Sequence, residues 1–140
     1  MADTFQLQVA TPERLFVDEQ VSEAELPGRN GYMGILPGHA PLLSALAPGI
    51  LSYGSGSARQ AIVIDGGFVE VFGDSVRVLA DSAERADQVD VNRARQDLEA
   101  AQSALREAHS SEESDAALER MQRAQARIDI TERGSGPAQH

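Results

Sequence analysis

The chain has 140 residues and a formal net charge of -10 at pH 7, from 22 acidic side chains against 12 basic ones, all of them arginine. Because the chain contains no cysteine, it has no thiol nucleophile, no disulfide framework and no cysteine-based zinc site. The absence of lysine excludes Schiff-base chemistry and a P-loop, both of which need that residue. An acidic chain is also a poor general binder of nucleic-acid phosphates.

The first ten residues mix polar and apolar side chains and include an acidic one, unlike a targeting segment with a basic end and an apolar run. No stretch approaches the roughly 18 consecutive apolar residues that a membrane-spanning helix needs. We therefore expect a cytosolic chain without a transmembrane segment.

Glycine and proline divide the chain into two parts. Ten of the 12 glycines and five of the six prolines precede residue 87, and residues 87–133 contain neither. Since both residues interrupt regular structure, the first part is predicted to be rich in turns and the second to be helical. We expect a domain over residues 1–86, a helical part over 87–133 and a disordered tail over 134–140.

The first part has the pattern of short strands. Phe5, Leu7 and Val9 alternate with polar residues, as in a half-buried strand. Further apolar runs lie at 21–26, 32–36, 41–46, 50–53, 61–64, 68–72 and 75–80. The run at 61–64 is apolar throughout, which indicates a strand buried on both faces, and Gly73-Asp74 is a tight hairpin signal. This spacing predicts a β-sandwich, or a small barrel, of about ten short strands.

The second part predicts an antiparallel helical hairpin. Apolar residues recur at steps of three and four from Val91 to Ala108 and again from Ala117 to Ile128, which indicates two narrow seams. Ser110 and Glu113 between them have the spacing of a capping box, which would start the second helix. The seams are rich in alanine, which buries less apolar area than leucine, so we expect a marginally stable hairpin that can open.

Three segments resemble the epsilon subunit of the F-type ATP synthase. They are GILPGHAPLL at 34–43, with the signature turn Pro37, Gly38, His39 and Pro41; DGGFVEV at 65–71 followed by VRVLADSAE at 76–84; and the C-terminal hairpin. The resemblance covers about residues 3–132. It implies an N-terminal β-sandwich, two C-terminal helices and a non-catalytic role in the central rotor stalk of a proton-driven synthase.

The resemblance also implies partners and a location. The gamma subunit and the membrane-embedded c-ring would dock on the sandwich, and the extended helices would reach the alpha and beta subunits and inhibit ATP hydrolysis. No cofactor is required, and the chain would lie peripherally at the cytoplasmic face of the bacterial inner membrane.

Two loops of the sandwich have interpretations that follow from the resemblance. The loop at 27–33 would face the c-ring through Arg29, Asn30, Gly31 and Tyr32, with Arg29 paired to an acid of the ring. The alternative is a solvated loop arginine. In the signature turn we expect His39 to be a packed or hydrogen-bonded residue without a catalytic role.

The hairpin carries a candidate regulatory ATP site. VDVNRA at 89–94 resembles the I/L-D-x-x-R-A motif of some bacterial epsilon subunits, although valine stands in its first position. The implied ligand set is Glu84, Val89, Asp90, Arg93, Ala94, Arg123 and Arg127. Arginines from two helices could clamp phosphates through charge-assisted hydrogen bonds.

Other interpretations stay open at this point. Asp90 with Arg93, and Glu119 with Arg123, have the spacing of ordinary surface pairs on a helix. The chain as a whole is compatible with a ligand-binding β-sandwich whose helical tail dimerises through the Val91–Ala108 seam. A small hydrolase is disfavoured because G-x-S-x-G and H-E-x-x-H are both absent.

Overall fold

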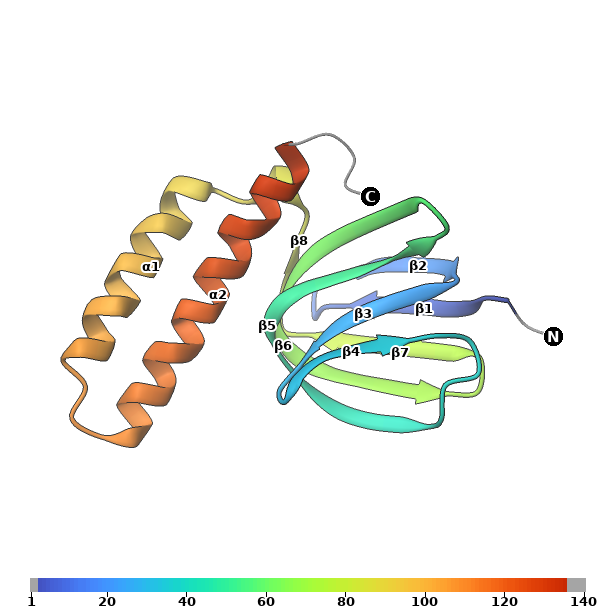
Figure 1. Ribbon diagram of the computed structural model, residues 1–140, viewed down its shortest axis with the longest axis horizontal. Helices are drawn as coiled ribbons and strands as arrows, with labels where there is room; N and C mark the ends of the chain where they lie inside the picture. The colour runs from blue at the N-terminus through green and yellow to red at the C-terminus, as the bar shows by residue number, and fades with distance from the viewer. Residues whose placement is uncertain (1–2, 136–140) are drawn as a thin grey trace.

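A computed structural model describes residues 3–135 as a β-domain followed by two helices (Figure 1). The strands are β1 (Phe5–Ala10), β2 (Leu15–Val21), β3 (Glu23–Gly28), β4 (Gly31–Ile35), β5 (Leu42–Ser55), β6 (Ala58–Phe72), β7 (Ser75–Ala80) and β8 (Ala83–Glu84). They are hydrogen-bonded in the order β2-β1-β7-β6-β5-β3-β4, with β8 paired to β6. Only the β1–β7 pairing is parallel among these strands.

Two long strands explain why the described residues form eight strands rather than the predicted ten or so. β5 has 14 residues and β6 has 15, and the two pair from Leu42 opposite Val71 to Ser55 opposite Ala58. Pro48-Gly49 and Gly66-Gly67, which have the composition of turns, lie inside these strands as bends. Gly67 has φ +118°, and a Cβ there would collide with the backbone of Leu79. The bends let one hydrogen-bonded sheet fold over itself into two layers.

The sandwich core confirms the alternation seen in the sequence. Phe5, Leu7 and Val9 of β1 are buried in the core between the layers. Along β6, Ile62 and Ile64 join that core, whereas Val63 faces the opposite way and packs under the helices. The strand is therefore buried on both faces at this point, as its uninterrupted apolar run predicted.

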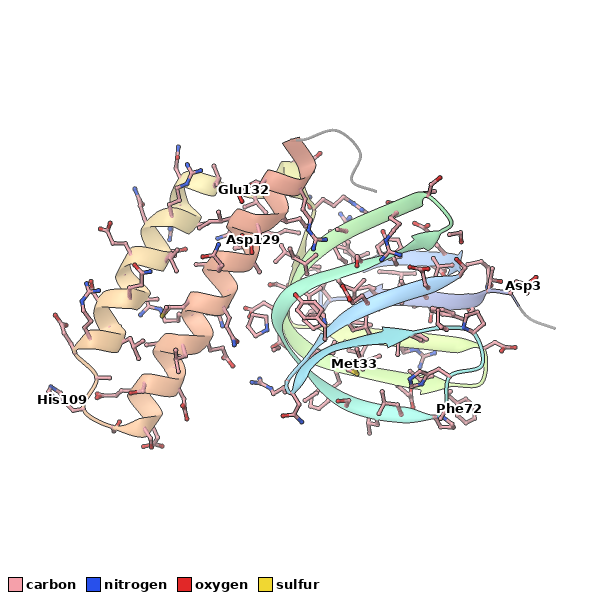
Figure 2. The ribbon with its side chains drawn as sticks, in the orientation of Figure 1. Asp3, Met33, Phe72, His109, Asp129 and Glu132 are labelled. Atoms are coloured by element: carbon pink, nitrogen blue, oxygen red, sulfur yellow. The ribbon has the colours of Figure 1, made fainter. Side chains whose placement is uncertain are left out.

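The hairpin consists of α1 (Val91–Arg106) and α2 (Ser111–Ser135), reached from β8 through the short 3-10 helix η1 (Ala86–Gln88). α2 lies between α1 and the sandwich (Figure 1). His109 marks the tip of the hairpin, at the opposite end of the molecule from Phe72 at the far end of β6 (Figure 2). Neither helix has, within residues 3–135, a segment with the length and hydropathy needed to span a bilayer.

The helix ends agree with the capping signals in part. Ser110 Oγ accepts a hydrogen bond from Glu113 N at 3.1 Å, so the second helix begins where the capping box predicted. The reciprocal bond differs, because Glu113 Oε1 accepts from His109 N at 2.6 Å, one residue before the cap. α2 continues to Ser135, two residues into the predicted tail. The rest of that tail, 136–140, lies outside the described residues.

Alanines form the seam between the two helices. Ala94 and Ala101 of α1 and Ala117 and Ala124 of α2 are buried, and side chains this small let two helices approach closely. The seam from Val91 to Ala108 is thus covered by α2 within the same chain, which leaves no free face there for the alternative of dimerisation.

A second contact holds the hairpin on the sandwich, and the sequence analysis missed it. Ala126 and Ile130 of α2 pack against Ile50 of β5 and Val63 of β6. Four buried side chains make a small apolar cluster, so this docking contact is much weaker than the sandwich core.

Candidate functional site

Arg127 of α2 and Glu84 of β8 join the hairpin to the sandwich. Arg127 Nε donates to Glu84 Oε1 at 2.8 Å and Arg127 Nη2 donates to Oε2 at 3.2 Å. The two side chains are 20% and 32% exposed, so water screens this pair only in part. Arg127 Nη1 also lies 3.8 Å from Asp97 Oδ2 on α1, and the guanidinium thus contacts carboxylates from two elements.

Arg123, one turn before Arg127, contacts the sandwich at a second point. Its Nε lies 2.8 Å from Asp65 Oδ1 on β6, and its Nη2 lies 3.7 Å from Glu119 Oε1. Both arginines line a cavity of about 220 Å³ between β6, β8 and α2. Its remaining lining residues are Val63, Ile64, Asp65, Ser82 and Glu84.

The α1 members of the predicted ATP set have different surroundings. Asp90 caps the helix, with Oδ1 accepting from Arg93 N at 3.1 Å. The Arg93 side chain reaches forward to Asp97, with Nε 3.6 Å from Oδ1, and does not form the ion pair with Asp90 that its spacing suggested. Val89 packs beside the docking cluster and Ala94 is buried in the seam.

The structure therefore brings Glu84, Arg123 and Arg127 together and links Arg93 to them through Asp97. The sequence analysis missed Asp65 and Asp97. Asp97 had a local signal, its spacing of four residues from Arg93 on one helix face. Asp65 had none, because it meets α2 only through the tertiary fold.

The β3–β4 turn, predicted to face the c-ring, lies beside the hairpin. Arg29 Nη1 lies 3.2 Å from Glu119 Oε2 of α2, and Tyr32 Oη accepts a hydrogen bond from Ile50 N at 3.0 Å. Asn30 and Gly31 at its tip are exposed. A groove of about 680 Å³ separates this turn and β5 from the helices.

The signature turn is shaped by hydrogen bonds and one glycine. His39 N donates to Leu36 O at 3.1 Å, and Gly38 in between has φ +82°, where a Cβ would be strained. His39 Nδ1 donates to Ala40 O at 2.7 Å. The ring is thus hydrogen-bonded to its own loop.

An exposed apolar face on the sandwich was not foreseen. Leu43 is 74% exposed, Phe68 57%, Phe72 73% and Leu79 55%. The register pairs Phe68 with Leu79, and Leu43 with the residue midway between Phe68 and Phe72, so all four lie on one outer face of β5, β6 and β7. The available signal was the run Phe68–Phe72, in which apolar residues occupy both faces of one strand.

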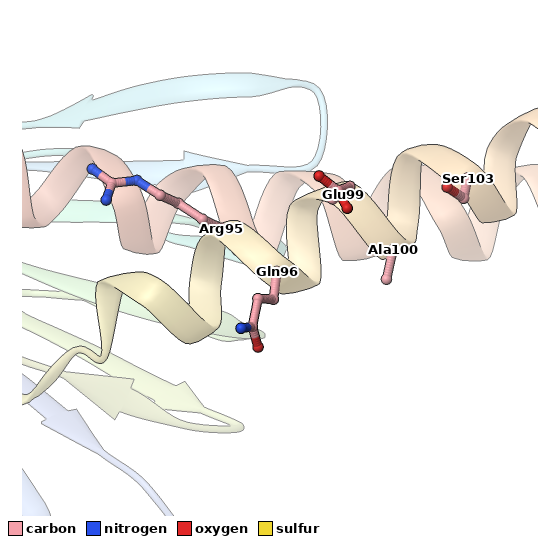
Figure 3. Close-up of a pocket in the computed structure, with 5 residues that line it drawn as sticks. All are labelled: Arg95, Gln96, Glu99, Ala100 and Ser103. Carbon is pink, nitrogen blue, oxygen red and sulfur yellow. The ribbon is translucent and has the colours of Figure 1, made fainter.

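A shallow hollow on α1 has no partner element. Arg95, Gln96, Glu99, Ala100 and Ser103 line about 270 Å³ on one side of this single helix (Figure 3). Because one helix supplies every lining residue, nothing encloses a ligand there. Among residues 3–135 no group of three or more histidine, aspartate or glutamate side chains is arranged to hold a metal ion.

Comparison with known proteins is consistent along nearly the whole chain. The family described as ATP synthase, delta/epsilon chain, beta-sandwich domain matches residues 4–86. The ATP synthase epsilon chain of Solibacter usitatus is 54% identical over 102 residues, which are 73% of this chain and 76% of that one. The ATP synthase epsilon chain of Nitratidesulfovibrio vulgaris is 38% identical over 130 residues, 93% of this chain and 97% of that one.

Solved structures share the fold. A chain in the Euglena gracilis mitochondrial ATP synthase, in a structure of OSCP, F1 and the c-ring, matches with a TM-score of 0.77 and 21% identity, covering 90% of this chain and 80% of that one. A chain in the Tetrahymena thermophila mitochondrial ATP synthase central stalk and c-ring matches at 0.67 and 14%, covering 90% and 95%. With the family match and the full-length relatives, these observations show that the chain belongs to the ATP synthase epsilon chain family.

Proposed function

We propose that the chain is a non-catalytic subunit of the central rotor stalk of a proton-driven ATP synthase, where it couples c-ring rotation to the catalytic head. The observation that carries this proposal is the apolar face formed by Leu43, Phe68, Phe72 and Leu79. Four large side chains exposed on one face of an otherwise acidic protein are typical of a protein–protein interface. The gamma subunit is the proposed occupant.

The β3–β4 turn is the proposed c-ring contact, through Asn30 and Gly31 at its tip. Arg29 in the same turn is paired with Glu119 of α2 while the hairpin is docked. Undocking would free Arg29 for an acid on the ring, so the turn would offer different charges to the ring in the two hairpin states. The subunit would then lie at the cytoplasmic face of the bacterial inner membrane, held there by the complex.

The hairpin is the proposed inhibitor of ATP hydrolysis. Its docking depends on the small cluster around Ile130 and on three ion pairs, which join Arg29 to Glu119, Arg123 to Asp65 and Arg127 to Glu84. Partly exposed pairs contribute about 0.2–1 kcal/mol each, so the hairpin can leave the sandwich. At about 1.5 Å per residue, α2 with its 25 residues is long enough to reach the alpha and beta subunits.

ATP is the proposed regulatory ligand of the docked hairpin. Arg93, Arg123 and Arg127 supply phosphate donors from both helices, and Glu84 supplies an acceptor from the sandwich. Binding across the junction would stabilise the docked state by mass action, so that abundant ATP would keep the hairpin from inhibiting the enzyme. The nucleotide would act as a signal, without being hydrolysed by this chain.

Binding to the gamma subunit tests the proposed role. We expect the double variant Leu43→Ser/Phe72→Ser to bind gamma at least about tenfold more weakly than the unmodified chain, because central apolar contacts dominate protein interfaces. Leu118→Ser is the matched control, since Leu118 is also exposed but lies on α2. Equal affinities of the double variant and the control, measured by calorimetry, would rule out the apolar face as the gamma site.

A further inference from the structure

Each arginine of the proposed nucleotide site already contacts a carboxylate of its own chain. Arg123 Nε is 2.8 Å from Asp65 Oδ1, and Arg93 Nε is 3.6 Å from Asp97 Oδ1. Arg127 Nη1 is 3.8 Å from Asp97 Oδ2, in addition to its two hydrogen bonds with Glu84. Glu84 belongs to the implied ATP set, whereas Asp65 and Asp97 do not.

Asp97 has the geometry of a bridging anion. One of its oxygens faces Arg93 on its own helix and the other faces Arg127 on the neighbouring helix. A phosphate clamped by arginines from two helices would sit in the same relationship to both guanidinium groups. Its carboxylate is therefore placed where a phosphate would have to go.

Asp65 occupies Arg123 from the sandwich side. The Nε atom of Arg123 is buried and has no hydrogen bond of good geometry, although Asp65 Oδ1 lies 2.8 Å away. This donor is held near an anion but is not fully satisfied by it. A ligand oxygen entering the cavity beside Arg123 could align better with the N–H.

The charge balance around the arginines works against an incoming polyanion. Asp65, Glu84, Asp97 and Glu119 all lie within 4 Å of an arginine nitrogen in this cluster. The cluster contains three arginines, so its own carboxylates already compensate the positive charge. A triphosphate must displace carboxylates or be repelled by them.

We infer that Asp65 and Asp97 are resident competitors of the nucleotide phosphates, and that they set the affinity of the site. This inference rests on the proposed nucleotide site. Without nucleotide, the two carboxylates hold the arginines and help to keep the hairpin docked. With nucleotide, phosphate oxygens replace them, so the ligand contributes only the difference between the two sets of contacts.

The two possible roles of these carboxylates predict opposite signs. If Asp65 and Asp97 merely position the arginines, removing their charge loosens the site and weakens nucleotide binding. If they compete with phosphate, removing their charge strengthens binding even though the free hairpin becomes less firmly docked. Charge-neutral substitution at both positions therefore separates competition from support.

The experiment is calorimetric titration of the full chain with ATP, AMP and inorganic tripolyphosphate. We expect Asp65→Asn and Asp97→Asn each to lower the Kd for ATP by about two- to fivefold, and the double variant by about tenfold, as partly exposed ion pairs would dictate. Tripolyphosphate should follow ATP, and AMP should change less because it has fewer phosphates. Asp115→Asn is the control, since Asp115 is exposed near the start of α2.

Hydrogen exchange of the helix amides gives a second readout. Without ligand, the double variant should exchange faster than the unmodified chain in α2, and saturating ATP should slow it again. Affinities for ATP that are unchanged or weaker in both variants would overturn the competition, while binding by the unmodified chain would leave the nucleotide site standing. No binding of ATP or tripolyphosphate at millimolar concentration by any of these chains would reject the nucleotide site and the competition together.

Discussion

Arg127 of α2 and Glu84 of β8 meet through two parallel hydrogen bonds, at 2.8 and 3.2 Å, across the junction between hairpin and sandwich. The pair connects the last strand of the sandwich to the second helix, 43 residues later in the chain. A bidentate arginine–carboxylate contact has both direction and register. It therefore defines where the helix sits along the sandwich more tightly than the apolar cluster does.

Glu84→Gln should loosen the docked hairpin without affecting the sandwich. The substitution removes the carboxylate charge and leaves Arg127 with Asp97 alone, so we expect a loss of about 1 kcal/mol in docking. Hydrogen exchange should speed up about fivefold in α2 and stay unchanged in β1 and β7. Glu25→Gln on β3 is the control, because Glu25 is exposed there. The same increase in both variants would show that the ion pair has no special role.

A disulfide should hold the hairpin on the sandwich and relieve inhibition. Ile50 and Ala126 pack in the docking cluster, and the chain has no cysteine of its own, so Ile50→Cys/Ala126→Cys can form only the intended bond within the chain. In a reconstituted synthase, oxidation should raise ATP hydrolysis and a reductant should return it to the starting rate. The two single-cysteine variants are the controls. An inhibitory role for the hairpin is excluded if hydrolysis is the same before and after oxidation.

Gly67→Ala should destabilise the sandwich strongly. Gly67 has φ +118°, and a Cβ would meet the Leu79 carbonyl and the Ala80 backbone, so the bend in β6 must distort. We expect a cost of at least about 2 kcal/mol in the free energy of unfolding, measured by urea denaturation. Gly34→Ala is the matched control, since a Cβ at Gly34 meets nothing within 4 Å. Similar midpoints for the two variants would contradict the role of the bend.

Stability should fall at alkaline pH because of Tyr53. Burial raises the pKa of Tyr53 above its ordinary value of 10.0, with Glu19 adding to the rise and Arg85 opposing it. Above that value the unfolded chain loses the phenolic proton while the folded chain keeps it, so unfolding becomes easier as pH rises. The slope approaches about 1.4 kcal/mol per pH unit until the folded group also ionises.

This effect can be measured without interference from most other side chains. The sequence has no lysine, no cysteine and only two tyrosines, so few groups titrate between about pH 9 and 11. Guanidinium unfolding from pH 8 to 11 should show the loss in the unmodified chain and in Tyr32→Phe. Tyr53→Phe should show a smaller slope. An equal slope in all three chains would mean that Tyr53 is not its source.

Local patterns in the sequence predicted the elements whose contacts lie close along the chain. The alternation of β1, the Gly73-Asp74 hairpin and the start of α2 at Ser110 were all expected and are confirmed. The continuity of β5 through Pro48-Gly49 was not, because it depends on pairing with β6 rather than on local propensity. β2 was missed since its middle residues, Asp18 to Gln20, are polar and exposed at the edge of the sheet.

The candidate site was foreseen only as far as the family resemblance reached. That resemblance named Glu84, Arg123 and Arg127, which the fold brings to one cavity. The anions that face them, Asp65 and Asp97, depend on how α2 lies across the sandwich and along α1. Such a placement is decided by contacts between distant segments, which a single sequence does not reveal by spacing.

The alanine-rich seam and the four-residue docking cluster also determine how hairpin release can be observed. Opening exposes little apolar surface, so its denaturant dependence and heat-capacity change are small. A urea or thermal melt therefore reports chiefly on the sandwich, whose core is large. Salt has the opposite selectivity, because ionic strength weakens the ion pairs around Arg123 and Arg127 while leaving the apolar core intact. Ionic strength is thus the variable that separates release of the helices from unfolding of the protein.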